Sequence, residues 1–145
     1  MNLRPALRIV RISALYDLVV TAGFALPFTA PALFASLGNL HETLGLHGVV
    51  PDPHNVMTVM FANLMGGLVL AWSVFRLVRP SLAAGVADSG GRSLFALGMG
   101  AALIGGATPI VVVMMALEIG WAVVQAVAVV AAWRRTRIAH SVAVA

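Results

Sequence analysis

The chain has 145 residues, of which 61% are hydrophobic and 10% charged, and its mean hydropathy is +0.99. A water-soluble domain of this length, typically about 45–50% apolar, could not bury so much apolar surface, so we expect the solvent around most of the chain to be lipid. The nine basic residues are all arginines that flank apolar runs, which argues against nucleic-acid binding, and the lack of cysteine excludes disulfides and thiolate chemistry.

Four apolar runs predict an all-α fold, an integral membrane four-helix bundle that forms a single transmembrane domain. The predicted spans cover residues 12–30, 56–75, 93–106 and 110–133. The first has about 19 residues, enough for the roughly 30 Å hydrocarbon layer at 1.5 Å per residue. The third would reach only about 21 Å, so it either begins earlier, near Leu82, or lies in thinned lipid. Asp88 or Ser89 is its expected N-cap.

Residues 31–46, between the first two spans, predict a short amphipathic helix. Its apolar stripe repeats at i, i+4, i+7 and i+11, and consists of Leu33, Leu37, Leu40 and Leu44. Polar residues occupy the rest of the wheel, so the segment is too polar to span. We expect it to lie flat at the membrane interface or to cap the bundle.

The first 30 residues also allow an alternative interpretation, as a cleavable secretory signal. Arginines precede the apolar stretch, and Ala30-Pro31-Ala32 follows it as a small-x-small triplet. Asp17 inside the stretch argues against this, and cleavage would leave three helices.

The positions of the arginines predict the orientation in the membrane. Three lie before the first span, three between the second and third, and three after the fourth, namely Arg4, Arg8, Arg11, Arg76, Arg79, Arg92, Arg134, Arg135 and Arg137. Short cytoplasmic loops retain arginine, so both termini and the middle loop should be cytoplasmic.

Polar residues inside the predicted spans are the candidate functional residues, because they are costly in lipid. Glu118 lies about 14 Å and Asn63 about 12 Å from the same side, so we expect them to meet near the midplane. Gln125 follows Glu118 at i+7 on one helix face. The cluster forms either a polar cavity in which Glu118 carries a proton, or a hydrogen bond from Glu118 to Asn63 that only ties helices together.

Asp17 lies closer to the cytoplasmic side, about 9 Å in, with Thr21 one turn deeper on the same face. Asp17 is expected to form an ion pair with Arg11 or Arg76 near the inner surface. This pairing leaves Asp17 outside a proton path.

Three histidines lie in the outer segment, at His41, His47 and His54. His41 and His47 are six residues apart, which does not match the i, i+4 pairs of zinc-binding helices. We therefore expect no metal site, and no cofactor, since no histidine lies at membrane depth. The sequence also contains no Ser/His/Asp set and no phosphate-binding glycine loop followed by lysine.

The order of features up to Arg76 resembles the DoxX-like family of small four-helix bacterial membrane proteins. The resemblance covers about the first 80 residues and rests on the Leu44-Gly45-Leu46 end of the amphipathic segment and on residues 63–70, Asn-Leu-Met-Gly-Gly-Leu-Val-Leu. It implies a bacterial inner-membrane bundle, with an accessory role beside a quinone-linked respiratory enzyme. It assigns no catalytic residue.

Three functions are compatible with these features. The sparse polar residues favour a non-catalytic accessory subunit, or a bundle that holds a lipophilic molecule. An oligomeric proton-coupled transporter would use Glu118 with Asn63 and Gln125, and a membrane enzyme acting on a lipid-soluble substrate would use Glu118 or Asp17 as acid and base. The expected partners are the lipid bilayer and either further copies of the chain or a larger membrane complex.

Overall fold

The computed structural model describes residues 3–144, with side chains for residues 3–136, and this part of the chain is all-α as predicted. Its five α-helices are α1 (Arg4–Thr21), α2 (Ala30–Thr43), α3 (Val56–Val78), α4 (Leu82–Ile104) and α5 (Ile110–Val144). A 3-10 turn, Ala22–Phe24, directly follows α1.

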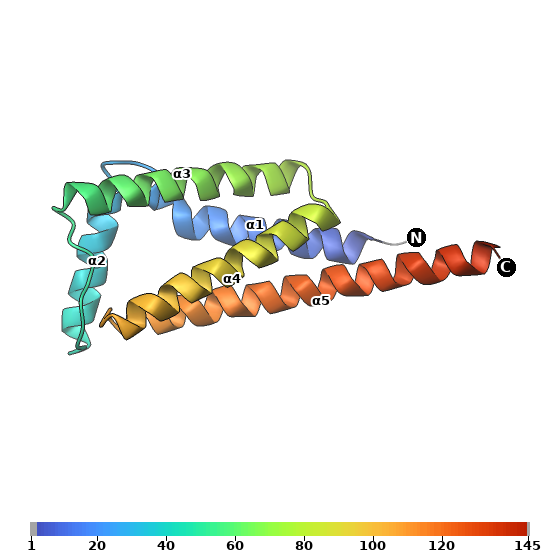
Figure 1. The fold of residues 1–145 in the computed structure, drawn as a ribbon. Coiled ribbons are helices and arrows are strands. Elements are labelled where there is room, and N and C mark those ends of the chain that lie inside the picture. Colours follow the sequence, from blue (N-terminus) through green and yellow to red (C-terminus); the bar gives the residue numbers. More distant parts are fainter. Residues whose placement is uncertain (1–2, 145) are drawn as a thin grey trace.

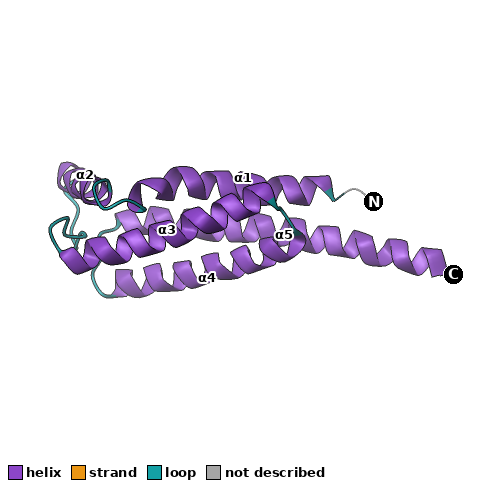
Figure 2. Cartoon of the chain, turned by 90° about the horizontal axis from the view of Figure 1, so that it is seen from above, coloured by secondary structure: helices purple, strands orange, loops and turns teal. Residues whose placement is uncertain are grey.

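Four long helices run along one axis, and α2 crosses them at one end (Figure 1). The pairs that pack most extensively are α1 with α3 and α4 with α5, and α1 also packs on α5. Both termini lie at the end opposite α2 (Figure 1), and in the view from above α2 is seen nearly end-on at its own end of the bundle (Figure 2). We call these two ends the α2 end and the arginine end.

Helix α4 begins earlier than the third predicted span, residues 93–106. Ser81 is its N-cap, and the side chain of Ser81 accepts a hydrogen bond from the backbone N–H of Ala84 at 3.0 Å. The prediction of Asp88 or Ser89 as the N-cap is therefore wrong. Gly90 and Gly91 favour a turn locally, but Asp88 and Arg92 form an i, i+4 ion pair inside the helix. The alternative of an earlier start, near Leu82, is confirmed, and with its 23 residues α4 is about 35 Å long.

The other helix bounds also differ from the predicted ranges. Helix α1 begins at Arg4, with Pro5 in its first turn, and ends at Thr21, well short of the predicted end at residue 30. Helices α3 and α5 extend beyond the predicted ends at 75 and 133. Helix α2 ends at Thr43, because Gly45 just beyond it adopts a φ of 60°, which side chains with a Cβ rarely adopt.

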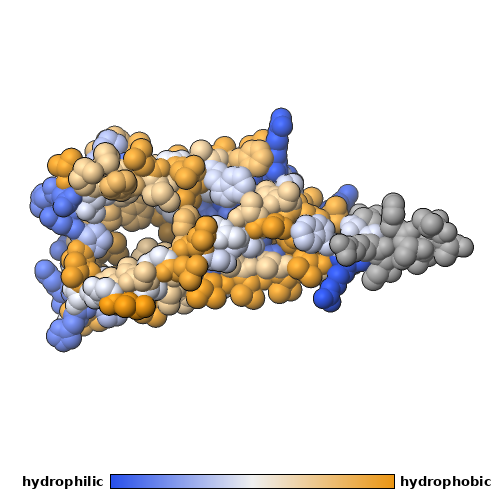
Figure 3. Space-filling view, viewed as in Figure 1, coloured by the Kyte–Doolittle hydropathy of each residue, from blue (hydrophilic) through white to orange (hydrophobic). Residues whose placement is uncertain are grey.

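Two of the described helical segments, Val56–Val78 and Ile110–Thr136, are long and apolar enough to cross a membrane. Only 11% and 6% of their most apolar windows are buried, whereas a core helix of a soluble protein would be mostly buried. On the face shown in Figure 3, apolar residues dominate the middle of the molecule, and hydrophilic residues gather toward its two ends. Helices α1 and α4 are not among these candidate spans, and the charged residues of α4, Asp88 and Arg92, both lie in its first half.

Packing is tight at the arginine end and loose at the α2 end. The buried residues of α4 lie between Ala84 and Arg92, and those of α5 lie between Gln125 and Ala132. No residue of 93–104 or 110–124 is buried. The space-filling view shows an opening in this half, beside α2 and between α3 and α4 (Figure 3). We call this opening the hollow.

The hollow is closed at the α2 end by contacts between the segment 44–55 and the α4–α5 turn. The backbone N–H of Val49 donates to the carbonyl of Gly106 at 2.8 Å, and the N–H of Thr108 donates to the carbonyl of Val49 at 2.9 Å. The His41 ring nitrogen Nδ1 lies 2.9 Å from Thr108 Oγ1. Gly106 has a φ of 90°, which permits the tight reversal.

Candidate functional site: a buried ion cluster

Five charged side chains meet in the interior, at the boundary between the packed half and the hollow. Each long helix contributes at least one, and the set consists of Asp17, Arg76, Asp88, Arg92 and Glu118. We call this set the ion cluster. It is the main polar contact among the four long helices of the described chain.

Arg92 is the centre of the ion cluster. Its guanidinium forms ion pairs with Asp17 at 2.6 Å, Asp88 at 3.0 Å and Glu118 at 2.7 Å. It also donates to Ser13 Oγ at 2.9 Å, and only 2% of the residue is exposed. The planar guanidinium carries five N–H donors, so one side chain can bind groups on α1, on α5 and on its own helix at once.

Arg76 is the second cation and is fully buried. It forms ion pairs with Asp17 and, at 2.6 Å, with Asp88. Its guanidinium carbon lies 5.7 Å from the centre of the Trp72 ring, and Trp72 Nε1 donates to Asp88 Oδ1 at 2.9 Å. Trp72 therefore contacts the Arg76 guanidinium with its ring and binds the Asp88 carboxylate with its N–H.

Gln125 links α5 to α4 on the side of the ion cluster that faces the arginine end. Its Nε2 donates to the carbonyl of Gly85 at 2.8 Å and to Asp88 Oδ2 at 2.9 Å. These two acceptors fix the orientation of the amide. Gly85 allows this close approach, since a Cβ there would lie 2.9 Å from a methyl group of Val129.

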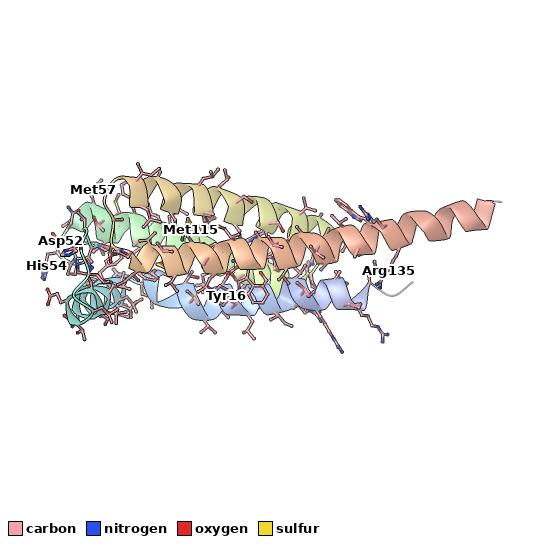
Figure 4. All side chains as sticks on the ribbon, turned by 90° about the horizontal axis from the view of Figure 1, so that it is seen from below. Tyr16, Asp52, His54, Met57, Met115 and Arg135 are labelled. Carbon is pink, nitrogen blue, oxygen red and sulfur yellow. The ribbon has the colours of Figure 1, made fainter. Side chains whose placement is uncertain are left out.

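The ion cluster contains three carboxylates and two guanidiniums, so it holds one negative charge in excess when all five groups are ionised. Glu118 is the least enclosed carboxylate, with 16% of its side chain exposed, and its ion pair is with Arg92. Arg92 is also 5.9 Å from the centre of the Tyr16 ring, which packs on Trp121. Tyr16 lies beside α5 midway along the bundle (Figure 4).

Glu118 lies on the same face of α5 as the buried residues Gln125 and Val129, but nearer the α2 end. Val111, Met115 and Ala122, at i−7, i−3 and i+4 from Glu118, are half-buried, as Glu118 itself is. Gln125 and Val129 continue the same face into the packed half, where both are buried. Glu118 therefore lies at the boundary between the packed half of α5 and the half that contains no buried residue.

The predicted contact between Glu118 and Asn63 is wrong. Asn63 Nδ2 donates to the backbone carbonyl of Phe24 at 2.8 Å, which ties α3 to the 3-10 turn after α1. Helices α3 and α5 each pack on α1 and not extensively on each other. Equal depth in the two helices therefore does not bring the side chains together.

The structure contains one of the two ion pairs proposed for Asp17. Asp17 pairs with Arg76, as predicted, while Arg11 is exposed. Thr21 does not join the ion cluster, because its hydroxyl donates to the backbone carbonyl of Asp17 at 2.6 Å within α1.

Arg92 was assigned from the sequence to a cytoplasmic loop, and its role at the centre was missed. The available signal was the i, i+4 spacing of Asp88 and Arg92, which favours an ion pair on one helix face. Two glycines between them favoured a turn instead.

The outer histidines are separated in the structure. His41 contacts Thr108, whereas His47 and His54 are exposed. Among the described residues, no group of three or more His, Asp or Glu side chains is arranged to hold a metal ion.

No protein-family model, no curated protein and no solved structure matches this chain. The resemblance to the DoxX-like family therefore stays a prediction from the sequence.

Proposed function

We propose that the chain is an integral membrane bundle in which α1, α3, α4 and α5 all cross the bilayer. The distribution of residues supports this, because many large apolar side chains are exposed on the outside, while Asp17 of α1 pairs inside with Arg92 of α4. A soluble bundle would have the reverse arrangement. Helix α2 would lie at the outer interface, where Leu40 and Leu44 are exposed.

The arginines support cytoplasmic termini and a bacterial inner-membrane location. Arg76 and Arg92 belong to the ion cluster, so the orientation rests on the other arginines of the sequence. These are Arg4, Arg8, Arg11, Arg79, Arg134, Arg135 and Arg137. All lie toward the arginine end of the helices proposed to span the membrane, or just beyond that end, as expected for the cytoplasmic side.

Within this bundle, the function that the geometry supports best is non-catalytic binding of a lipophilic molecule. The observation that carries the proposal is the hollow, which lies in the half of the bundle where 93–104 and 110–124 contain no buried residue and which has the segment 44–55 at its end. An apolar molecule would enter from the side, from lipid. Binding sites between helices are commonly apolar with a few polar groups that fix the orientation of the ligand.

The ion cluster itself fits a structural tie better than a catalytic centre. Asp17 and Asp88 each bind both guanidiniums, which leaves neither free to exchange protons with a substrate. This disfavours Asp17 as the acid and base of a membrane enzyme. An accessory subunit that presents the bound molecule to a larger complex is compatible with the same arrangement.

Filling the hollow tests the binding proposal. Ala96 is half-buried and lies one turn beyond Arg92 on the inner face of α4, while Ala101 is exposed on the opposite face. Ala96→Phe and Ala101→Phe therefore make the same change on the inner and on the outer face of α4, in the half of the helix that borders the hollow. We expect organic extracts of the purified wild type and of Ala101→Phe to contain, by mass spectrometry, a lipophilic compound that Ala96→Phe lacks. Identical extracts from all three proteins would contradict the proposal.

A proton-coupled carrier is the second candidate, because the excess negative charge of the ion cluster lies at Glu118, beside the hollow. Such a carrier would be expected to form oligomers, since four spans are few for a monomeric transporter. Glu118→Gln separates the two functions. A carrier would lose proton-coupled uptake in vesicles, whereas a binding bundle would keep its bound compound.

A further inference from the structure

The arginine end carries positive charge without any acidic residue. Arg4, Arg8, Arg11, Arg79, Arg134 and Arg135 are exposed there. All five acidic residues of the sequence lie elsewhere, three in the ion cluster and two, Glu42 and Asp52, at the α2 end. Hydrophilic side chains project from this end of the molecule (Figure 3).

A narrow crevice opens at this end, between the first turns of α1 and the later part of α5. It has a volume of about 130 Å³ and is lined by Pro5, Ala6, Ile9, Ala128, Ala131 and Ala132, with Arg135 completing the wall. The side chains are small on the α5 side, so the two helices leave space between them. Figure 4 shows Arg135 close to the N-terminal end of α1.

We propose that this crevice binds an anionic phospholipid, with part of an acyl chain against the alanines and the phosphate at Arg135. The inference rests on the proposed membrane placement. The crevice is too small for a helix of another protein, and its apolar lining fits a hydrocarbon chain better than a free phosphate ion. An anionic headgroup complements an end of the molecule whose ionised side chains are arginines and include no acidic residue. A zwitterionic headgroup carries a cation of its own, which these arginines would repel.

The proposal is tested by native mass spectrometry of the full chain in mild detergent, titrated with phosphatidylglycerol or with phosphatidylcholine. Arg135→Gln removes the charge, and Ala131→Leu fills the crevice at an exposed position while keeping the charge. We expect each to weaken phosphatidylglycerol binding about fivefold. Arg79→Gln is the matched control, since Arg79 is exposed at the same end but outside the crevice. The Arg79→Gln protein should bind phosphatidylglycerol as tightly as the wild type does.

Two results would overturn the lipid site. One is equal binding of both lipids by the wild type. The other is an equal loss in Arg79→Gln and Arg135→Gln with no loss in Ala131→Leu, which would indicate a general attraction to the arginines. Failure of the membrane placement is distinguishable, because the protein would then be recovered from the soluble fraction without detergent.

Discussion

Arg92→Gln is expected to lower the free energy of unfolding by about 3–5 kcal/mol, the usual cost of removing one partner from a buried ion pair. The substitution leaves Asp17, Asp88 and Glu118 with a single guanidinium, so two negative charges are uncompensated in the interior. Unfolding of the purified protein in mild detergent, followed by circular dichroism, measures the loss.

Glu118→Gln is the matched comparison and should cost less than about 1 kcal/mol. It leaves two carboxylates with two guanidiniums, and the amide oxygen can still accept the hydrogen bond from Arg92. A loss as large as that of Arg92→Gln would show that charge balance does not govern the stability of the ion cluster.

Gly66→Ala is expected to lower the free energy of unfolding by about 1–3 kcal/mol, as overpacking does in tight interiors. A Cβ on Gly66 would lie 2.6 Å from the carbonyl carbon of Phe24 and 2.7 Å from the backbone nitrogen of Ala25. Backbone atoms cannot yield as a flexible side chain does. Movement of the Phe24 backbone away from the added Cβ would also break the hydrogen bond from Asn63 to the Phe24 carbonyl.

Gly67→Ala controls for the intrinsic effect of alanine in the same helix. A Cβ on Gly67 would meet nothing within 4 Å, so stability should be unchanged or slightly higher, because alanine favours helix more than glycine does. Equal effects of the two substitutions, measured by thermal unfolding in the same detergent, would argue against close contact between α3 and the turn after α1.

The sequence predicts the helical class and most helix positions well, because apolar runs bounded by arginine, glycine and proline are local signals. Helices α1 and α4 are the exceptions, and for α4 the structure shows the physical reason. Gly90 and Gly91 favour a turn, and the ion pairs of Asp88 and Arg92 with α1, α3 and α5 override that preference. Such long-range contacts are not visible in local periodicity.

The candidate site was predictable only in part, for a related reason. The prediction that polar residues inside apolar runs face the interior holds for Asp17 and Gln125, which are buried, and for Glu118, which pairs with Arg92. Depth does not say which helices are neighbours, so Asn63 was paired with Glu118 although α1 packs on both of their helices. The hollow depends on the same arrangement and has no sequence signal.

Labelling of single cysteines tests the central claim, a bilayer-spanning bundle whose two ends face opposite compartments. The chain has no cysteine, so Glu42→Cys at the α2 end and Arg79→Cys or Arg134→Cys at the arginine end each carry a unique thiol. With a membrane-impermeant maleimide on intact cells, Glu42→Cys should react at once, and the other two only after permeabilisation. Equal labelling of all three in intact cells, or protection of Glu42→Cys alone, would contradict the account.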